Sequence, residues 1–196
     1  MPHKFDPKKM DHLESHGRRK LMDAEEILSS LPLDPGQSVV DIGCGTGFFA
    51  VPLSKRLPQG KVYALDIADE MLERLRQKVQ DNGIGNIEII KSGEMEFPVP
   101  EGAMDGAVLS AVLHEQEDRI EFLKRVRDLL KPGAWLLIVE WQKKESPMGP
   151  SLEERIDEAE LRDMASQARF RTASARAIGE FNYMAVLTRS GDPGSQ

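Results

Sequence analysis

The sequence contains one cysteine, few aromatic residues and no long apolar run. Cys44 cannot form an internal disulfide bond and supplies no cysteine-based metal site. No apolar stretch approaches the ~20 residues of a membrane-spanning helix. The polar opening MPHKFDPKKM also lacks the core of a secretory signal. These absences predict a soluble cytoplasmic protein with no metal site and no membrane attachment.

The chain also has no excess of basic residues. The chain has 26 Lys and Arg against 33 Asp and Glu, a formal net charge of −7 at pH 7. Without a basic patch, the sequence offers no electrostatic footprint for nucleic acid. The charge balance therefore predicts no nucleic-acid partner and no anionic membrane surface as a partner.

The chain alternates short apolar runs with helical patterns, which is typical of an α/β protein built around a mostly parallel sheet. Only a short turn near Gly179 joins the last two expected strands, so these should be antiparallel, because a parallel pair needs a long crossover. Strands are expected at 38–42, 61–66, 86–91, 106–111, 134–140, 170–177 and 183–188.

Sequence patterns typical of helices lie between these expected strands. Phe49, Leu53 and Leu57 recur at helical spacing after a start near Thr46, and Pro58 ends that helix. Other helices are expected from a cap at Asp69 to Gly83, along Ile120, Leu123, Val126 and Leu130, and from the capping pair Asp157 and Glu160.

One domain is expected over residues 36–190, with a helical cover segment at 1–35 and a disordered tail at 191–196. A second stretch, 142–156, could also cover a substrate, and Gly149-Pro150 within it suggests a bent, mobile lid. The cover segment carries the helical pattern Leu21, Ile27, Leu28 and Leu31, and the expected surface histidines His3, His12 and His16.

The stretch VVDIGCGTGFF places Asp41 just ahead of three alternating glycines at the end of the first expected strand. Glycines allow left-handed backbone angles and let a ligand approach the main chain. Ligands of open parallel sheets bind beyond the carboxyl ends of the strands. Asp66 ends the second strand, where an acid can accept hydrogen bonds from both hydroxyls of a ribose. The glycines are Gly43, Gly45 and Gly47.

Two classes of nucleotide ligand compete for this turn. The dinucleotide fingerprint Gly-x-Gly-x-x-Gly needs a glycine where Phe48 stands, and Asp41 would repel a pyrophosphate. S-adenosylmethionine shares the adenosine but carries an ammonium and a sulfonium instead of phosphates. An acid attracts the ammonium, while backbone amides at a helix start face the carboxylate. The residues favour a nucleoside with a cationic tail.

The motifs VVDIGCGTGFFA and VYALDIADEM, followed by the terminal hairpin, resemble the class I S-adenosylmethionine-dependent methyltransferases. The nearest resemblance is to the small enzymes grouped with ubiquinone and menaquinone biosynthesis. It implies a Rossmann-like, doubly wound sheet of seven strands in a three-layer sandwich, with an antiparallel strand at the C-terminus. It also implies that S-adenosylmethionine is the cofactor and that its methyl group passes to an acceptor by direct displacement.

The resemblance assigns site residues by position. Asp41 and the three glycines would surround the methionine part, and Asp66 would hold the ribose. Ile67 and Met71 would contact the adenine or line its entrance. The segment KSGEMEFPVP resembles the family's adenine-edge loop, although Gly93 stands where an aspartate is usual, so either Glu94 or main-chain groups replace it. The cofactor contacts implied in addition are Glu94, Met95 and Ala111.

His114 follows the fourth expected strand, at the end where this family places substrate-facing groups. Imidazole can take a proton from an attacking acceptor near neutral pH, and Glu115 beside it could raise the pKa of the ring. The alternative is that His114 packs beneath a loop. Trp141, just past the fifth strand, could stack on a substrate or seal the end of the sheet.

Motifs that the sequence lacks reduce the range of possible methyl acceptors. The fourth strand leads into SAVLHE instead of the Asn/Asp-Pro-Pro-Tyr of nucleic-acid amino-methyltransferases, and one thiol cannot support arsenic methylation. A small molecule methylated on carbon, oxygen or nitrogen remains, and a homodimer could supply walls that the short chain lacks. Two other hypotheses stay open: a non-catalytic cofactor-binding scaffold, and an NAD(P)-dependent oxidoreductase, which Asp41 and Phe48 disfavour.

Overall fold

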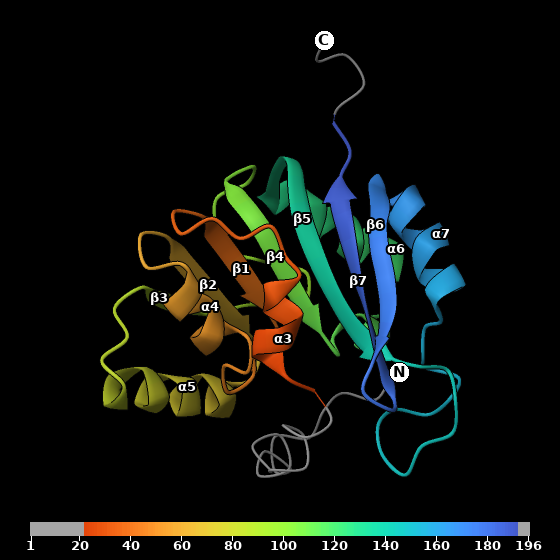
Figure 1. Cartoon of the computed structure of the whole chain (residues 1–196), viewed down its shortest axis with the longest axis horizontal. Helices are drawn as coiled ribbons and strands as arrows, with labels where there is room; N and C mark the ends of the chain where they lie inside the picture. Colours follow the sequence, from red (N-terminus) through yellow and green to blue (C-terminus); the bar gives the residue numbers. More distant parts are fainter. Residues whose placement is uncertain (1–21, 192–196) are drawn as a thin grey trace. The chain divides into compact units, whose positions relative to one another are not determined.

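The computed structural model describes residues 22–191 (Figure 1). These residues divide into two compact units. The N-terminal unit ends at Val99, and the C-terminal unit begins at Pro100. Several sequence predictions concern positions outside the described residues, namely most of the cover segment with Leu21, His3, His12 and His16, and the tail beyond Gly191.

Three parallel strands form the centre of the N-terminal unit, in the order β3-β2-β1. β2 pairs with both neighbours, so that Tyr63 lies opposite Val40 and Ala64 lies opposite Ile89. Most residues of β1 and β2 are buried, as expected for parallel strands covered on both faces. The bounds are Ser38–Ile42 for β1, Lys61–Asp66 for β2 and Ile87–Lys91 for β3.

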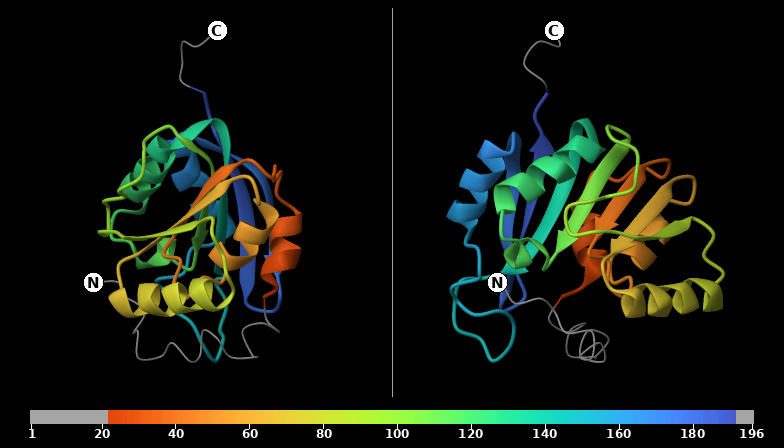
Figure 2. Two further views of the ribbon diagram at one scale, coloured as in Figure 1. Left: turned by 90° about the vertical axis from the view of Figure 1, so that its left-hand side faces the viewer. Right: turned by 180° about the vertical axis from the view of Figure 1, so that it is seen from behind.

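Helices α4 (Ala50–Arg56) and α5 (Asp69–Asp81) both pack against these strands (Figure 2). α4 begins four residues later than predicted. Pro52 therefore falls in its first turn, where the missing N–H of proline is harmless. The predicted cap of α5 was wrong: Ala68 occupies the N-cap position, and Asp69 instead forms an ion pair with Lys91 at 2.8 Å.

A short helix, α3 (Ala24–Ser29), is the described part of the predicted cover segment. Asp23 caps it by accepting hydrogen bonds from the N–H groups of Glu25 and Glu26. Its buried side chains include Ile27 and Leu28, and the helix packs on α4. A helix is therefore present at 24–29, while the assignment of residues 1–35 as a helical cover stays a prediction.

Four strands form the C-terminal unit, in the order β4-β5-β7-β6. β4 and β5 are parallel, and β7 runs antiparallel to both of its neighbours, which confirms the predicted hairpin. β5 begins earlier than predicted because a register shift and Gly133, at φ 79°, accommodate the Lys-Pro-Gly sequence within the strand. The bounds are Met104–Ser110 for β4, Leu130–Trp141 for β5, Phe170–Ile178 for β6 and Asn182–Arg189 for β7.

Helices α6 (Arg119–Leu129) and α7 (Glu158–Gln167) lie side by side on one face of these strands (Figure 2). α7 begins with the predicted capping box, in which Asp157 and Glu160 each accept a main-chain hydrogen bond from the other. A 3-10 turn, η2 (Leu113–Glu115), precedes α6. The described residues therefore form a mostly parallel sheet of seven strands accompanied by helices, and the predicted fold class is confirmed.

Candidate functional site

The turn after β1 depends on glycines with left-handed backbone angles. Gly43, Gly45 and Gly47 have φ values of 68°, 53° and 86°, which are strained for any residue with a Cβ. A Cβ at Gly45 would meet no atom within 4 Å, whereas one at Gly47 would lie 2.5 Å from Leu75 Cδ1. Gly45 thus presents its main chain to open space that a ligand can enter, and Gly47 permits close packing of α5.

Asp66 ends β2 and joins that strand to the glycine turn. It is 8% exposed, and its Oδ2 accepts a hydrogen bond of 2.8 Å from the N–H of Gly45. Oδ1 accepts a hydrogen bond of 2.9 Å from the N–H of Ala68. Each carboxylate oxygen has two acceptor sites, so both oxygens retain capacity for a ligand hydroxyl. Burial raises the pKa of Asp66, although the N–H groups of Ala68, Gly45 and Ile67 oppose this effect.

A second carboxylate lies close to the turn. Asp41 is in β1 and is only 2% exposed. Burial, followed by the charges of Asp41 and Asp66, raises the pKa of the Cys44 thiol well above its ordinary value. A thiol that stays protonated at neutral pH is a poor nucleophile, which supports a packing role for Cys44. The negative field at this turn favours a ligand with a cationic tail.

Ile67 follows Asp66 and is 44% exposed, which is unusual for a large apolar side chain beside a buried strand. Its carbonyl accepts a hydrogen bond of 2.7 Å from Nζ of Lys91, whose ion pair with Asp69 ties the same segment to α5. The exposed side chain is therefore displayed on a main chain that Lys91 holds in place. Such a surface suits the flat apolar face of an adenine.

The other predicted adenine contacts differ in exposure. Met71 is 4% exposed and belongs to the inner face of α5. Glu94 is exposed and Met95 is half-buried, both in the loop after β3. That loop begins beside Asp66, because the N–H of Ser92 donates a hydrogen bond of 3.0 Å to the carbonyl of Asp66. The N-terminal unit thus brings Asp66 and the loop after β3 together, while their contacts with ribose and adenine stay predictions.

Ala111 is the one predicted cofactor residue in the C-terminal unit. It lies immediately after β4, outside the strand that was predicted to include it, and has φ 58°. A left-handed alanine costs about 1–2 kcal/mol. Its N–H donates a hydrogen bond of 2.8 Å to the carbonyl of Val139, which helps to hold this conformation. Strain of this kind is concentrated at functional sites.

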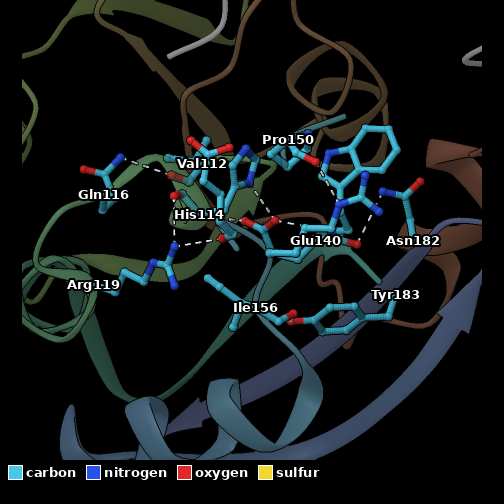
Figure 3. Close-up of polar contacts among 12 residues, drawn as sticks. Val112, His114, Gln116, Arg119, Glu140, Pro150, Ile156, Asn182 and Tyr183 are labelled. Carbon is cyan, nitrogen blue, oxygen red and sulfur yellow. Dashed lines mark hydrogen bonds and ion pairs between the residues drawn. The ribbon is translucent and has the colours of Figure 1, made fainter. Parts of the chain in front are cut away.

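His114 lies in η2 and faces a buried carboxylate (Figure 3). Its Nδ1 is 2.8 Å from Oε2 of Glu140, and the two side chains are 6% and 1% exposed. The main-chain N–H of His114 donates to Oε1 of the same carboxylate at 3.2 Å, and its carbonyl accepts from Arg119 at 3.2 Å. The histidine is therefore fixed by its ring and by both sides of its main chain.

Glu140 controls the charge of this histidine. Burial alone would lower the pKa of His114, but the hydrogen bond and the charge of Glu140, together with the charge of Glu115, raise that pKa above its ordinary value. Glu115 adds to the rise and Arg119 opposes it. Sequence reasoning considered only Glu115 and missed Glu140. The available signal was an acid directly after the apolar run 134–139 of the strand, since a buried charge needs a partner.

Arg155 organises the second predicted cover stretch and was also missed from the sequence. It is 3% exposed, and its guanidinium lies 5.5 Å from the ring centre of Trp141. Gly149 packs against the same ring, where a Cβ would come within 2.8 Å of the indole. All five N–H groups of Arg155 are used, by the carbonyls of Gln142, Lys144, Met148 and Pro150 and by the hydroxyl of Ser146. The guanidinium, with all of its N–H groups hydrogen-bonded, holds the 142–150 stretch and the indole together.

Two further findings concern the described part of the chain as a whole. No helix within residues 22–191 combines the length and the apolar character needed to cross a membrane. Among the same residues, no group of three or more His, Cys, Asp or Glu side chains is arranged to hold a metal ion.

Residues 39–133 match the family described as "Methyltransferase domain". The chain is 31% identical over 124 residues to the demethylmenaquinone methyltransferase of Geobacillus kaustophilus, covering 63% of this chain and 53% of that protein. It is 37% identical over 111 residues to the Vibrio campbellii ubiquinone/menaquinone biosynthesis C-methyltransferase UbiE, covering 56% of this chain and 43% of that one. The chain thus spans about half the length of the curated relatives it matches.

A solved structure matches nearly all of the chain. The SAM-dependent methyltransferase from Aquifex aeolicus is 33% identical, with a TM-score of 0.89, and the match covers 95% of this chain and 100% of that one. Identity at this level over the full length of a relative, together with the matched domain and the seven-stranded fold, identifies the family. The chain belongs to the class I S-adenosylmethionine-dependent methyltransferases, of the type to which the UbiE enzymes belong.

Proposed function

We propose that this protein transfers a methyl group from S-adenosylmethionine to a small-molecule acceptor by direct displacement. The observation that carries this proposal is the hydrogen bond between Asp66 and the N–H of Gly45. It couples the acid suited to a ribose with the glycine whose main chain faces open space. A nucleoside and its amino-acid tail could therefore engage one preformed structure, and family membership supports this reading.

The residues of the N-terminal unit fit such a cofactor. Asp66 would accept from the ribose hydroxyls, Ile67 would pack on the adenine, and the carboxylate of Asp41 would favour the ammonium. The main chain at Gly45 would lie along the methionine part. When bound, S-adenosylmethionine supplies a methyl group that is already activated by a sulfonium, so the protein needs chiefly to align the acceptor.

The net charge of the chain and the names of its relatives support a small molecule as the proposed acceptor. A net charge of −7 disfavours nucleic acid, and the names of the relatives refer to quinone biosynthesis. Reduced quinones are therefore the first acceptors to test. His114 is proposed as the group that removes a proton from the acceptor. We further propose a cytoplasmic enzyme that acts away from the membrane, and a homodimer that would complete the acceptor site.

Titration calorimetry with S-adenosylmethionine, S-adenosylhomocysteine, NAD and NADP tests the cofactor. We expect binding of the first two alone; binding of NAD in preference would overturn the proposal. Transfer of a labelled methyl group to a panel of reduced quinones and other metabolites then separates an enzyme from a scaffold. A protein that binds S-adenosylhomocysteine but transfers no label to any acceptor is a scaffold.

A further inference from the structure

The hydrogen bond between Glu140 and His114 determines which nitrogen of the imidazole carries a proton. An ionised carboxylate can only accept hydrogen bonds, so Nδ1, at 2.8 Å from Oε2, must be the donor. In neutral imidazole the other nitrogen then carries a lone pair. The structure therefore assigns Nε2 of His114 as the atom that can accept a proton.

The carboxylate of Glu140 is itself held in place. Oε1 accepts from the N–H of His114 at 3.2 Å, and Oε2 accepts from the N–H of Trp141 at 3.3 Å. The side chain is 1% exposed, so water does not compete for these contacts. Arg119 fixes the same turn from its other side through the carbonyl of His114 at 3.2 Å and that of Glu154 at 2.8 Å. A group oriented this precisely is expected where chemistry depends on geometry.

We infer that Glu140 is a positioning residue for the methyl transfer proposed above, holding His114 so that Nε2 takes the proton of a phenol-like hydroxyl on the acceptor. In this step the O–H bond breaks and an N–H bond forms at Nε2. The electron pair left on the acceptor forms the bond to the methyl carbon, and the pair of the broken carbon–sulfur bond stays on sulfur. The imidazolium returns its proton to water.

The acceptor class follows from acidity. Phenol-like hydroxyls have a pKa of about 10, close enough to that of an imidazole for useful proton transfer. Aliphatic alcohols are far weaker acids, and neutral amines already possess the attacking lone pair. The groups around His114 also favour a stronger base, since Glu140 from β5 and Glu115 from η2 raise its pKa, while Arg119 from α6 opposes them. Of the common acceptors, a phenol-like hydroxyl benefits most from this pair.

The direct test is nitrogen-15 NMR of the histidine side chains in the full chain, without any ligand. We expect His114 to carry its proton on Nδ1 in the wild type. Glu140→Gln replaces the carboxylate by an amide of the same shape, and should abolish this preference and lower the pKa of His114. Glu115→Gln is the matched control, because it removes a nearby charge but leaves the hydrogen bond to Nδ1. An unchanged tautomer and pKa in Glu140→Gln would overturn the inference.

Kinetics with reduced 1,4-naphthoquinone, which carries two phenolic hydroxyls, complete the test. Glu140→Gln should lower kcat about 10²- to 10⁴-fold, with little change in KM for S-adenosylmethionine and with the acidic limb of the rate profile moved to lower pH. If Glu140→Gln does not fold, Glu140→Asp, which withdraws the carboxylate from Nδ1, should show the same pattern. A kinetic defect of the Glu140 variants that is confined to KM would overturn the inference. So would a wild type that methylates only amines. Failure of the wild type to bind S-adenosylhomocysteine would instead refute the proposed function. The tautomer of His114 is measured without ligand, so that result does not depend on cofactor binding.

Discussion

The carboxylate of Asp66 accepts a hydrogen bond of 2.8 Å from the main-chain N–H of Gly45, and so connects the end of β2 to the turn after β1. The same carboxylate also accepts from the N–H of Ala68, which fixes the main chain directly after the exposed Ile67. One buried acid therefore organises both the main chain and the side chain proposed to meet the cofactor.

Asp66→Asn should weaken cofactor binding strongly. The amide keeps the size of the side chain but removes the charged acceptor, and each hydrogen bond to a charged group contributes about 1.5–3 kcal/mol. The dissociation constant of S-adenosylhomocysteine should rise roughly 10- to 150-fold for each bond lost, as measured by titration calorimetry. Glu70→Gln, an exposed change in the first turn of α5, is the control and should bind normally. Unchanged affinity of Asp66→Asn would show that this acid does not meet the ribose.

Alanine at Gly45 and at Gly47 should produce different defects. At Gly47 the new Cβ would come within 2.5 Å of Leu75 and 3.2 Å of Val51, so unfolding free energy should fall by about 1–3 kcal/mol. At Gly45 the Cβ meets no atom, and only the left-handed backbone is strained, at a cost of about 1–2 kcal/mol. Gly45→Ala should instead lose affinity for S-adenosylhomocysteine. Equal affinity of Gly45→Ala and the wild type would mean that no ligand approaches this glycine.

Local signals explain which parts of the molecule the sequence predicts well. The bounds of β1 and β2 agree with prediction, because each is an apolar run that ends at a motif. The capping box of α7 depends on residues three positions apart, and it too was predicted correctly. Asp66 was predicted as a site residue because strand ends and glycine turns have a known geometry, although its bond to Gly45 emerges only in the structure.

Contacts between distant residues account for what the sequence did not reveal. Glu140 lies 26 positions from His114, and only the parallel pairing of β4 with β5 brings their strand ends together. The five acceptors of Arg155 are mostly main-chain carbonyls, which leave no trace in side-chain patterns. The left-handed backbone of Ala111 is equally invisible, since alanine gives no sign of that conformation.

Ala111→Gly should stabilise the protein by about 1 kcal/mol, because glycine accepts a left-handed backbone without strain. Arg169→Gly is the matched control: Arg169 has φ 61° just after α7 and should give a similar gain. Urea unfolding measures both. If the strain at Ala111 serves function, only Ala111→Gly should also slow methyl transfer, since it loosens the segment that leads to His114. Equal activity in the two variants would show that this strain has no functional role.

Arg155→Lys should release the 142–150 stretch while the rest of the fold persists. A lysine has three donors in place of five and cannot present the planar fork that reaches five acceptors around the guanidinium. We expect limited proteolysis to cut within 142–150 much faster than in the wild type, and the fluorescence of Trp141 to change. Lys143→Arg, at an exposed ion pair with Glu160, is the control. Resistance of Arg155→Lys to proteolysis would show that other contacts hold this stretch.

The last prediction concerns the pH dependence of stability at His114. The folded protein raises the pKa of this histidine, mainly through Glu140 acting against burial. Such a group contributes stability that is fully present below the unfolded pKa of about 6.5 and is lost as pH rises through the higher folded value. His114→Asn places an amide donor near the position of Nδ1, so it can keep the bond to Glu140 but cannot be protonated.

The wild type should therefore exceed His114→Asn in unfolding free energy most clearly at low pH, and the difference should shrink as pH rises. Urea titrations from pH 5.5 to 8.5 measure it. At the alkaline end, where the two proteins should be similarly stable, the variant should still transfer methyl groups about 10²- to 10⁴-fold more slowly, because it lacks Nε2. A stability difference that stays constant or grows with pH would contradict the assigned pKa direction. Full activity of His114→Asn at that same pH would mean that the protein acts only by aligning the acceptor, since no other side chain has been proposed to accept the proton.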